Sequence, residues 1–410
     1  MTRTEELADL LKNTKNLILH GAPGTGKTFL AFEIAKQMGC TENEICFVQF
    51  HPSYDYTDFV EGIRPSNNGQ TGFERVDGLF KQFCKTALKK SINSSEEDLK
   101  KIICDKIKES NEFVMKGYQY DYTYTLDSEH DDILVFSILR GIIPPPYDKV
   151  TIRLSGLVQF MFFDELILPK EDIKENEQVK RYYCDLKEKL LKDVKINDLY
   201  KNNDNSFVFI IDEINRGELS KIFGELFFSI DPGYRGMKER SVQTQYQNFV
   251  SEDDIFAKGF YVPDNVYIIG TMNDIDRSVE SMDLAMHRRF AFEEIEAKDS
   301  AEMLDKRELW KNSDVSSLPI DKLKNRMERL NDAIVSEEIG LNPAYQIGAA
   351  YFLKYEMYKD ESDPFDCLWK YNFKPLLQEY LRRQGDEEEK LDMLKAAYDS
   401  ADNANAENAS

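Results

Sequence analysis

The octapeptide GAPGTGKT, residues 21–28, is the feature that most constrains the fold of this chain. It matches the pattern G-x-x-x-x-G-K-[S/T], follows the apolar run NLILH (16–20), and precedes KTFLAFEIAKQM (27–38), whose apolar residues recur at helical spacing. A glycine-rich loop between a strand and a helix turns its backbone N–H groups toward a polyphosphate. The residues predicted to bind the nucleotide are Gly21, Ala22, Pro23, Gly24, Thr25, Gly26, Lys27 and Thr28.

Two side chains of this loop carry the predicted chemistry. We expect Lys27 to reach the β- and γ-phosphates and Thr28 to hold Mg²⁺ through its hydroxyl. The alternative is a glycine-rich turn that matches the pattern by chance. The strand before the loop and the helix after it favour the phosphate site.

A second apolar run ends in two acids. The segment SFVFIIDE (206–213) is typical of a buried strand, and it places Asp212 and Glu213 at the strand's carboxyl end. Ligands bind at this edge of an open α/β sheet. We expect Asp212 to position Mg²⁺ and Glu213 to deprotonate the attacking water, although an Asp-Glu pair alone usually marks a turn.

The stretch TMNDIDRSVESMDLAMHRRF (271–290) collects an amide, acids and arginines. Asn273 ends the apolar run NVYIIGTMN and could hydrogen-bond the γ-phosphate or the attacking water, or it could form a turn. Arg288 and Arg289 follow a short helical segment and stand at the start of the strand-like RFAFEEIE (289–296). We predict that they complete a neighbouring subunit's site, which implies a ring, rather than only complement a helix dipole.

The remaining chain divides by its patterns. Apolar strands that alternate with amphipathic helices predict an α/β domain with a parallel sheet over residues 1–298. Residues 62–78 predict a hairpin, residues 219–230 a single helical face, and residues 85–200 a Lys/Glu-rich insertion. Residues 299–398 are predicted to form a helical domain, and residues 399–410 a disordered tail.

Composition excludes several classes of protein. The net charge of -22 disfavours a broad contact with DNA, so DNA would be reached through a pore or a partner. No apolar run is long enough to cross a bilayer, and the start of the chain does not resemble a signal peptide. Six singly spaced cysteines and four histidines argue for reduced thiols, a cytoplasmic location and no zinc site.

These motifs together resemble those of AAA+ nucleotide-hydrolysing proteins. The segments DEINRGELSKIFGEL (212–226), YQIGAAYF (345–352) and M-N-x-x-D-R-S (272–278) resemble more narrowly the McrB family, the motor subunits of modification-dependent restriction systems. The resemblance implies a P-loop AAA+ domain with a five-stranded parallel sheet and a helical lid, which hydrolyses GTP or ATP with Mg²⁺. It also implies a ring, a hexamer in this family, and an McrC-like nuclease partner in DNA restriction and antiphage defence. By position, it adds Asp276 to the catalytic residues.

Two further expectations accompany the resemblance. The segment YQIGAAYF (345–352) lacks the arginine that many AAA+ lids offer to the nucleotide, and no nuclease-like set of carboxylates and a lysine is evident, so we expect no DNA cleavage by this chain alone. A MoxR-like chaperone, which would use the same kind of ring to remodel other proteins, is the alternative function.

Overall fold

A computed structural model of the 410-residue chain describes residues 2–65, 72–91, 205–251, 254–275, 284–310, 318–382 and 385–400, and the backbone of four further strands. The chain forms two compact units. One contains Met1–Cys84 and Ser206–Ser410, and the other contains Lys85–Asn205. The predicted tail at 401–410 lies outside the described residues.

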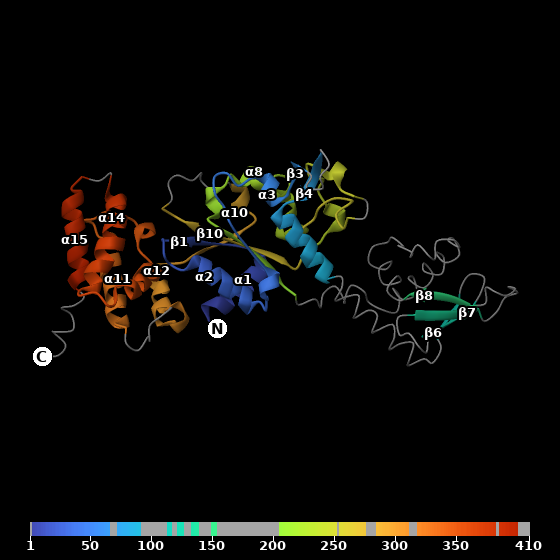
Figure 1. Ribbon diagram of the computed structural model, residues 1–410, viewed down its shortest axis with the longest axis horizontal. Helices are drawn as coiled ribbons and strands as arrows, with labels where there is room; N and C mark the ends of the chain where they lie inside the picture. Colours follow the sequence, from blue (N-terminus) through green and yellow to red (C-terminus); the bar gives the residue numbers. More distant parts are fainter. Residues whose placement is uncertain are drawn as a thin grey trace. The chain divides into compact units, whose positions relative to one another are not determined.

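The first unit is built on a five-stranded parallel sheet, as predicted (Figure 1). The strand order is β11-β1-β10-β9-β2, and every neighbouring pair is parallel. The strands are β1 (Asn16–Gly21), β2 (Ile45–Gln49), β9 (Phe207–Asp212), β10 (Val266–Asn273) and β11 (Ala291–Glu294). Because the strands are parallel, the P-loop after β1 and the polar ends of β9 and β10 all meet at one edge of the sheet.

Apolar side chains cover both faces of this sheet. On one face, Val208 and Ile210 of β9 pack with residues of α1 (Arg3–Thr14) and α2 (Lys27–Gln37). On the other face, Phe209 contacts the rings of Phe59 and Phe80 edge-on. The strands are therefore buried on both sides, which accounts for their continuous apolar runs.

Two sequence predictions outside the sheet have different outcomes. The predicted hairpin is confirmed, since β3 (Glu61–Pro65) and β4 (Phe73–Asp77) pair antiparallel. The single helix predicted over 219–230 is wrong, because Gly224 adopts φ +48° and divides it into α8 (Leu219–Phe223) and α9 (Leu226–Ser229). This backbone conformation lies outside the helical region and is one that favours glycine, so the helix ends there. The other short helices of the α/β part are α3 (Tyr56–Phe59) and α10 (Leu284–His287).

The described residues from 297 onward form a helical bundle with one core. Its helices are α11 (Ile320–Ile334), α12 (Ala349–Phe352), α13 (Pro364–Leu368), α14 (Lys374–Leu381) and α15 (Glu387–Ser400), and the 3₁₀ segment η7 (Lys298–Asp305) precedes them. Leu323, Met327 and Leu330 of α11 are buried against Leu391 and Leu394 of α15 in this core. The expected helical lid is thus confirmed, although residues 301–310 form 3₁₀ turns and not an α-helix.

The second unit contains a four-stranded antiparallel sheet, with the order β5-β6-β7-β8. Its strands are β5 (Phe113–Lys116), β6 (Asp121–Leu126), β7 (Ile133–Ile138) and β8 (Lys149–Arg153). No helix in the described part of the chain is long and apolar enough to cross a membrane.

Candidate active site

The P-loop is folded around the side chain of Lys27. The buried ammonium donates hydrogen bonds to the carbonyl oxygens of Gly21 (3.1 Å) and Ala22 (2.7 Å). Burial lowers the pKa of Lys27 to about 8, although the carboxylates at the same sheet edge favour its charged form. Gly24 and Gly26 adopt φ +76° and +81°, a backbone region that favours glycine. The loop therefore holds a desolvated cation beside turned backbone amides, which suits a polyphosphate.

Asp212 is held by two hydroxyl groups. Its Oδ1 accepts hydrogen bonds from Thr28 Oγ1 (2.7 Å) and from Thr271 Oγ1 (2.6 Å). The structure thus brings the two predicted Mg²⁺ ligands, Thr28 and Asp212, into direct contact. One carboxylate and one hydroxyl fit Mg²⁺, which takes few protein oxygens and completes its shell with water and phosphate oxygens. The described residues contain no cluster of three or more His, Cys, Asp or Glu side chains that could hold another metal.

Glu213 lies between an amide and a guanidinium group. Asn273 Nδ2 donates to Glu213 Oε1 (2.7 Å), and Arg216 Nε lies 3.2 Å from Glu213 Oε2. Glu213 also has a left-handed backbone with φ 51° and ψ 46°, a conformation that costs about 1 kcal/mol or more and is found at functional sites. The strand ends of β9 and β10 therefore present the predicted base and the predicted amide as one hydrogen-bonded pair.

The two predicted arginines differ in their surroundings. The Arg288 side chain is 70% exposed, and its guanidinium lies 3.5 Å from Asp231. Arg289 instead donates to the carbonyl oxygens of Phe227 (2.6 Å) and Ala285 (2.8 Å), and it stacks over the Phe227 ring. Arg289 is thus engaged within its own chain, and Arg288 extends into solvent.

The arginines also lie far from the P-loop of their own chain. Asn16, the first residue of β1, donates its amide to the carbonyl oxygen of Arg289 (2.8 Å). The P-loop leaves the other end of β1, and a six-residue strand is roughly 17 Å long. The structure therefore does not bring Arg288 and Arg289 together with the other predicted site residues. Asp276 lies outside the described residues.

The lid touches the P-loop through backbone groups. The amides of Gly348 and Ala350 donate to the carbonyl oxygens of Pro23 and Gly24, both at 2.9 Å. A Cβ on Gly348 would collide with the backbone of Gly24 and Thr25, so only glycine allows this approach. The lid segment that lacks an arginine is therefore docked directly on the phosphate-binding loop.

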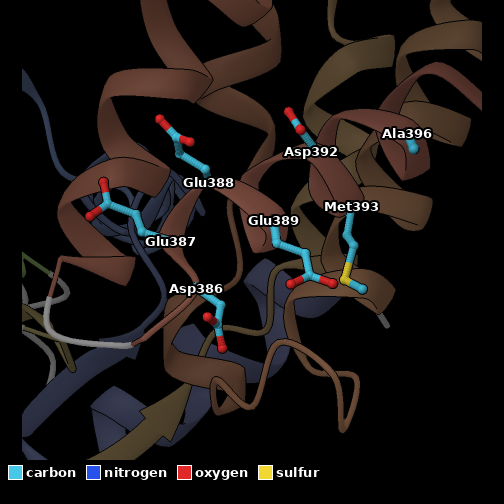
Figure 2. A pocket seen from close by; sticks show the side chains of 7 residues that line it. All are labelled: Asp386, Glu387, Glu388, Glu389, Asp392, Met393 and Ala396. Carbon is cyan, nitrogen blue, oxygen red and sulfur yellow. The ribbon is translucent and has the colours of Figure 1, made fainter.

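The lid also carries an open acidic hollow of about 920 Å³, which lies outside this site (Figure 2). Its lining residues are Asp386, Glu387, Glu388, Glu389, Asp392, Met393 and Ala396. Glu387, Glu388 and Glu389 form the first turn of α15, where carboxylates complement the helix dipole. A cluster of carboxylates repels phosphates, so the hollow is not a second nucleotide site.

The fold and the site together define a P-loop nucleotide-binding protein with a helical lid. The chain belongs to the AAA domain family of the dynein-related subfamily, which it matches over residues 16–106 and 168–290. Residues 322–389 match the McrB alpha-helical lid domain, so the chain is an McrB-like AAA+ protein, as the sequence motifs indicated.

Two curated relatives support this assignment. The chain is 28% identical over 386 residues to the type IV methyl-directed restriction enzyme EcoKMcrB subunit of Escherichia coli (strain K12), which covers 92% of this chain and 56% of that protein. It is 24% identical over 302 residues to the type II restriction enzyme BsuMI component YdiS of Bacillus subtilis (strain 168), which covers 73% of this chain and 61% of that protein. The chain thus spans less than two thirds of the length of either relative.

Sequence reasoning missed three groups at this site, namely Thr271, Arg216 and Gly348. The position of Thr271 at the site could have been predicted from the sequence. Residues two apart on a strand lie on the same face, and Thr271 precedes Asn273 by two residues. The contact of Arg216 with Glu213 depends on the left-handed turn at Glu213, which no local pattern predicts.

Proposed function

We propose that the protein is a Mg²⁺-dependent nucleoside triphosphatase that uses GTP or ATP. The observation that carries the proposal is the convergence of Lys27, the Thr28–Asp212 pair and the Glu213–Asn273 pair at one edge of the sheet. Each of these groups has a distinct task in phosphoryl transfer, and a P-loop fold that only binds nucleotide does not need the last pair.

The residues divide the work as follows. Thr28 and Asp212 would hold Mg²⁺, which supplies positive charge to the β- and γ-phosphate oxygens when it is bound. Lys27 places its ammonium on the same phosphates. Glu213 accepts a proton from the attacking water, and Asn273 directs the Glu213 carboxylate and the water by its amide.

A neighbouring subunit completes the site. Because the Arg288–Arg289 turn lies at the opposite end of β1 from the P-loop, neither arginine is placed to serve its own nucleotide. We therefore propose a homo-oligomeric ring, as in a hexamer, in which the exposed Arg288 of one subunit approaches the γ-phosphate held by the next. An arginine supplied in trans stabilises charge that develops on the transferred phosphoryl group.

The names of the two relatives support a proposal for the biological role. Both are components of restriction enzymes by name. We propose that this chain is the motor subunit of an McrBC-like restriction and antiphage defence system, and that a separate McrC-like nuclease subunit cuts the DNA. Since the chain carries a net charge of -22, we expect DNA to be contacted through a pore or through the partner and not over a broad surface.

Turnover of GTP and ATP, measured side by side, tests the hydrolase. We expect phosphate release from at least one of them in the presence of Mg²⁺, alone or with the nuclease partner, and a return to background when EDTA removes the metal. The Thr28–Asp212 pair predicts that Mg²⁺ readdition restores the rate. Protein that releases no phosphate from either nucleotide, with and without the partner, contradicts the proposal.

The docking of the lid on the P-loop predicts the effect of a single methyl group. Gly348→Ala is expected to push the lid away, at a cost of about 1–3 kcal/mol, because the new Cβ meets backbone atoms that cannot rotate aside. The same free energy corresponds to a fall in nucleotide affinity of about 5- to 150-fold. Titration with a fluorescent nucleotide measures this. Gly385→Ala is the matched lid control, since a Cβ there meets no atom within 4 Å.

If the Gly348→Ala variant binds nucleotide as the Gly385→Ala control does, the contact between lid and P-loop makes no contribution to binding. Thermal unfolding of both variants should show that the α/β part and the lid remain folded.

A further inference from the structure

His20 and Asp274 form a pair that the proposed mechanism does not use. His20 Nδ1 lies 3.0 Å from Asp274 Oδ2 and 3.2 Å from Oδ1. The two side chains are 24% and 23% exposed, so water only partly screens the contact. His20 is the penultimate residue of β1, and Asp274 is the first residue after β10.

This pair links β1 to the first residue beyond the β1–β10 ladder, at the active-site edge of the sheet. The β1–β10 ladder ends where Gly21 pairs with Asn273. Beyond it, the Asp274 amide donates to the Gly21 carbonyl at 3.4 Å, which is long for such a hydrogen bond. The side-chain contact with His20 is therefore the closer link that ties the Asp274 turn to β1.

The imidazole ring is itself held from the other side. Phe292 of β11 meets the His20 ring edge-on, with centroids 6.2 Å apart, and His287 stacks on the same Phe292 ring at 4.3 Å. A ring fixed between two strands can impose a position on its hydrogen-bond partner. Asn273 and Asp274 share a peptide unit, so a fixed Asp274 also fixes the backbone from which the Asn273 side chain reaches Glu213.

We propose that His20 is a positioning residue for hydrolysis, which through Asp274 holds Asn273 in the direction that aligns Glu213. The proposal rests on the hydrolytic function proposed above. It predicts that loss of the pair slows turnover without weakening the binding of nucleotide, because Lys27, Thr28 and Asp212 are held by other contacts.

The pair also gives the positioning a pH dependence. The hydrogen bond to Asp274 raises the pKa of His20 above its usual value, burial opposes this, and the charges of Asp274 and of Glu294 on β11 add to the rise while that of Lys27 opposes it. A histidine whose pKa is raised by folding stabilises the folded state. This stabilisation is fully present at pH values below the histidine's pKa in the unfolded chain, and it is lost as pH rises through its pKa in the folded chain. The His20–Asp274 ion pair thus weakens toward alkaline pH.

Steady-state hydrolysis across neutral pH, measured on the full chain with the proposed nuclease partner, tests the proposal. The variants are His20→Gln, Asp274→Asn and the double variant. Each single variant should lower kcat about three- to tenfold, as expected for the net contribution of one hydrogen bond, with KM unchanged. The double variant should be no slower than either single variant. In the wild type, kcat should decline toward alkaline pH as the pair weakens, and all three variants should lack this decline. His51→Gln changes an exposed histidine that lacks a carboxylate contact among the interactions described, and it should match the wild type.

A second measurement separates this inference from the proposed function. The His20 ring can be titrated by NMR in a chain with four histidines, and its pKa should fall when Asp274 is changed to Asn, whether or not the protein hydrolyses nucleotide. An unchanged His20 titration in Asp274→Asn, or wild-type kcat and pH dependence in His20→Gln, overturns the positioning role. A wild type that hydrolyses neither GTP nor ATP overturns the proposed function instead, and the titration still reports on the pair.

Discussion

Glu213→Gln is expected to lower kcat for nucleotide hydrolysis about 10²- to 10⁴-fold, the usual contribution of a positioned general base. The substitution keeps the oxygen that accepts the Asn273 amide hydrogen bond, and it leaves the contact of Thr28 with Asp212 unchanged. Nucleotide affinity and assembly should therefore match the wild type. Phosphate release and binding of a fluorescent nucleotide, measured on the same preparation, give the two quantities separately.

The control for this variant is Glu218→Gln, a nearby glutamate whose side chain is half exposed and pairs with Lys221. It should hydrolyse nucleotide like the wild type. A Glu213→Gln variant that retains wild-type kcat would show that another group accepts the proton.

Arg288→Ala is expected to reduce kcat about 10³-fold or more in the assembled protein, because an arginine in trans contributes this much to phosphoryl transfer. The guanidinium is exposed, and within the described part of the chain its ion-pair partner is Asp231 at 3.5 Å, so its removal should leave the unfolding temperature unchanged. Turnover and thermal unfolding are measured on the same protein. Nucleotide binding to the variant's own P-loop should persist.

Arg289→Ala serves as the comparison and should behave differently. It removes the hydrogen bonds to Phe227 and Ala285 and the stacking on the Phe227 ring, so it should lower the unfolding temperature. If Arg289→Ala abolishes turnover with normal stability while Arg288→Ala remains active, then Arg289, and not Arg288, is the arginine supplied to the neighbouring site.

The parts of the site that follow from the sequence are those that strand ends determine. The acids after SFVFIID and the amide after NVYIIGTM stand at the ends of apolar runs, and parallel pairing then brings those ends to the P-loop. The sequence therefore predicted that Glu213 and Asn273 lie near each other, although not that they form a hydrogen bond. The parallel sheet and the helical domain were predictable from the period of the apolar residues, whereas the number of five strands and the role of the helical domain as a lid came from the resemblance to AAA+ proteins.

Contacts that depend on tertiary packing were not predictable. No local pattern predicts the contact of Asp274, because its partner His20 is 254 residues away in the sequence. The difference between Arg288 and Arg289 depends on where Phe227 lies. The break at Gly224 shows the same limit within one segment. The residues around it keep the apolar spacing of one helix, but a positive φ at the glycine ends the first helix and starts a second.

The central claim is that each active site combines the machinery of one subunit with an arginine of the next. Mixing the Glu213→Gln and Arg288→Ala variants tests it most directly. Each variant should be nearly inactive alone. In a mixed ring, an Arg288→Ala subunit keeps its own Glu213 and can receive the intact Arg288 of a Glu213→Gln neighbour.

The account predicts that hydrolysis reappears on mixing and rises with the fraction of mixed interfaces, once exchange of subunits has been verified by labelled protein. Mixtures that co-assemble yet hydrolyse no more nucleotide than the separate variants would contradict a site shared between subunits.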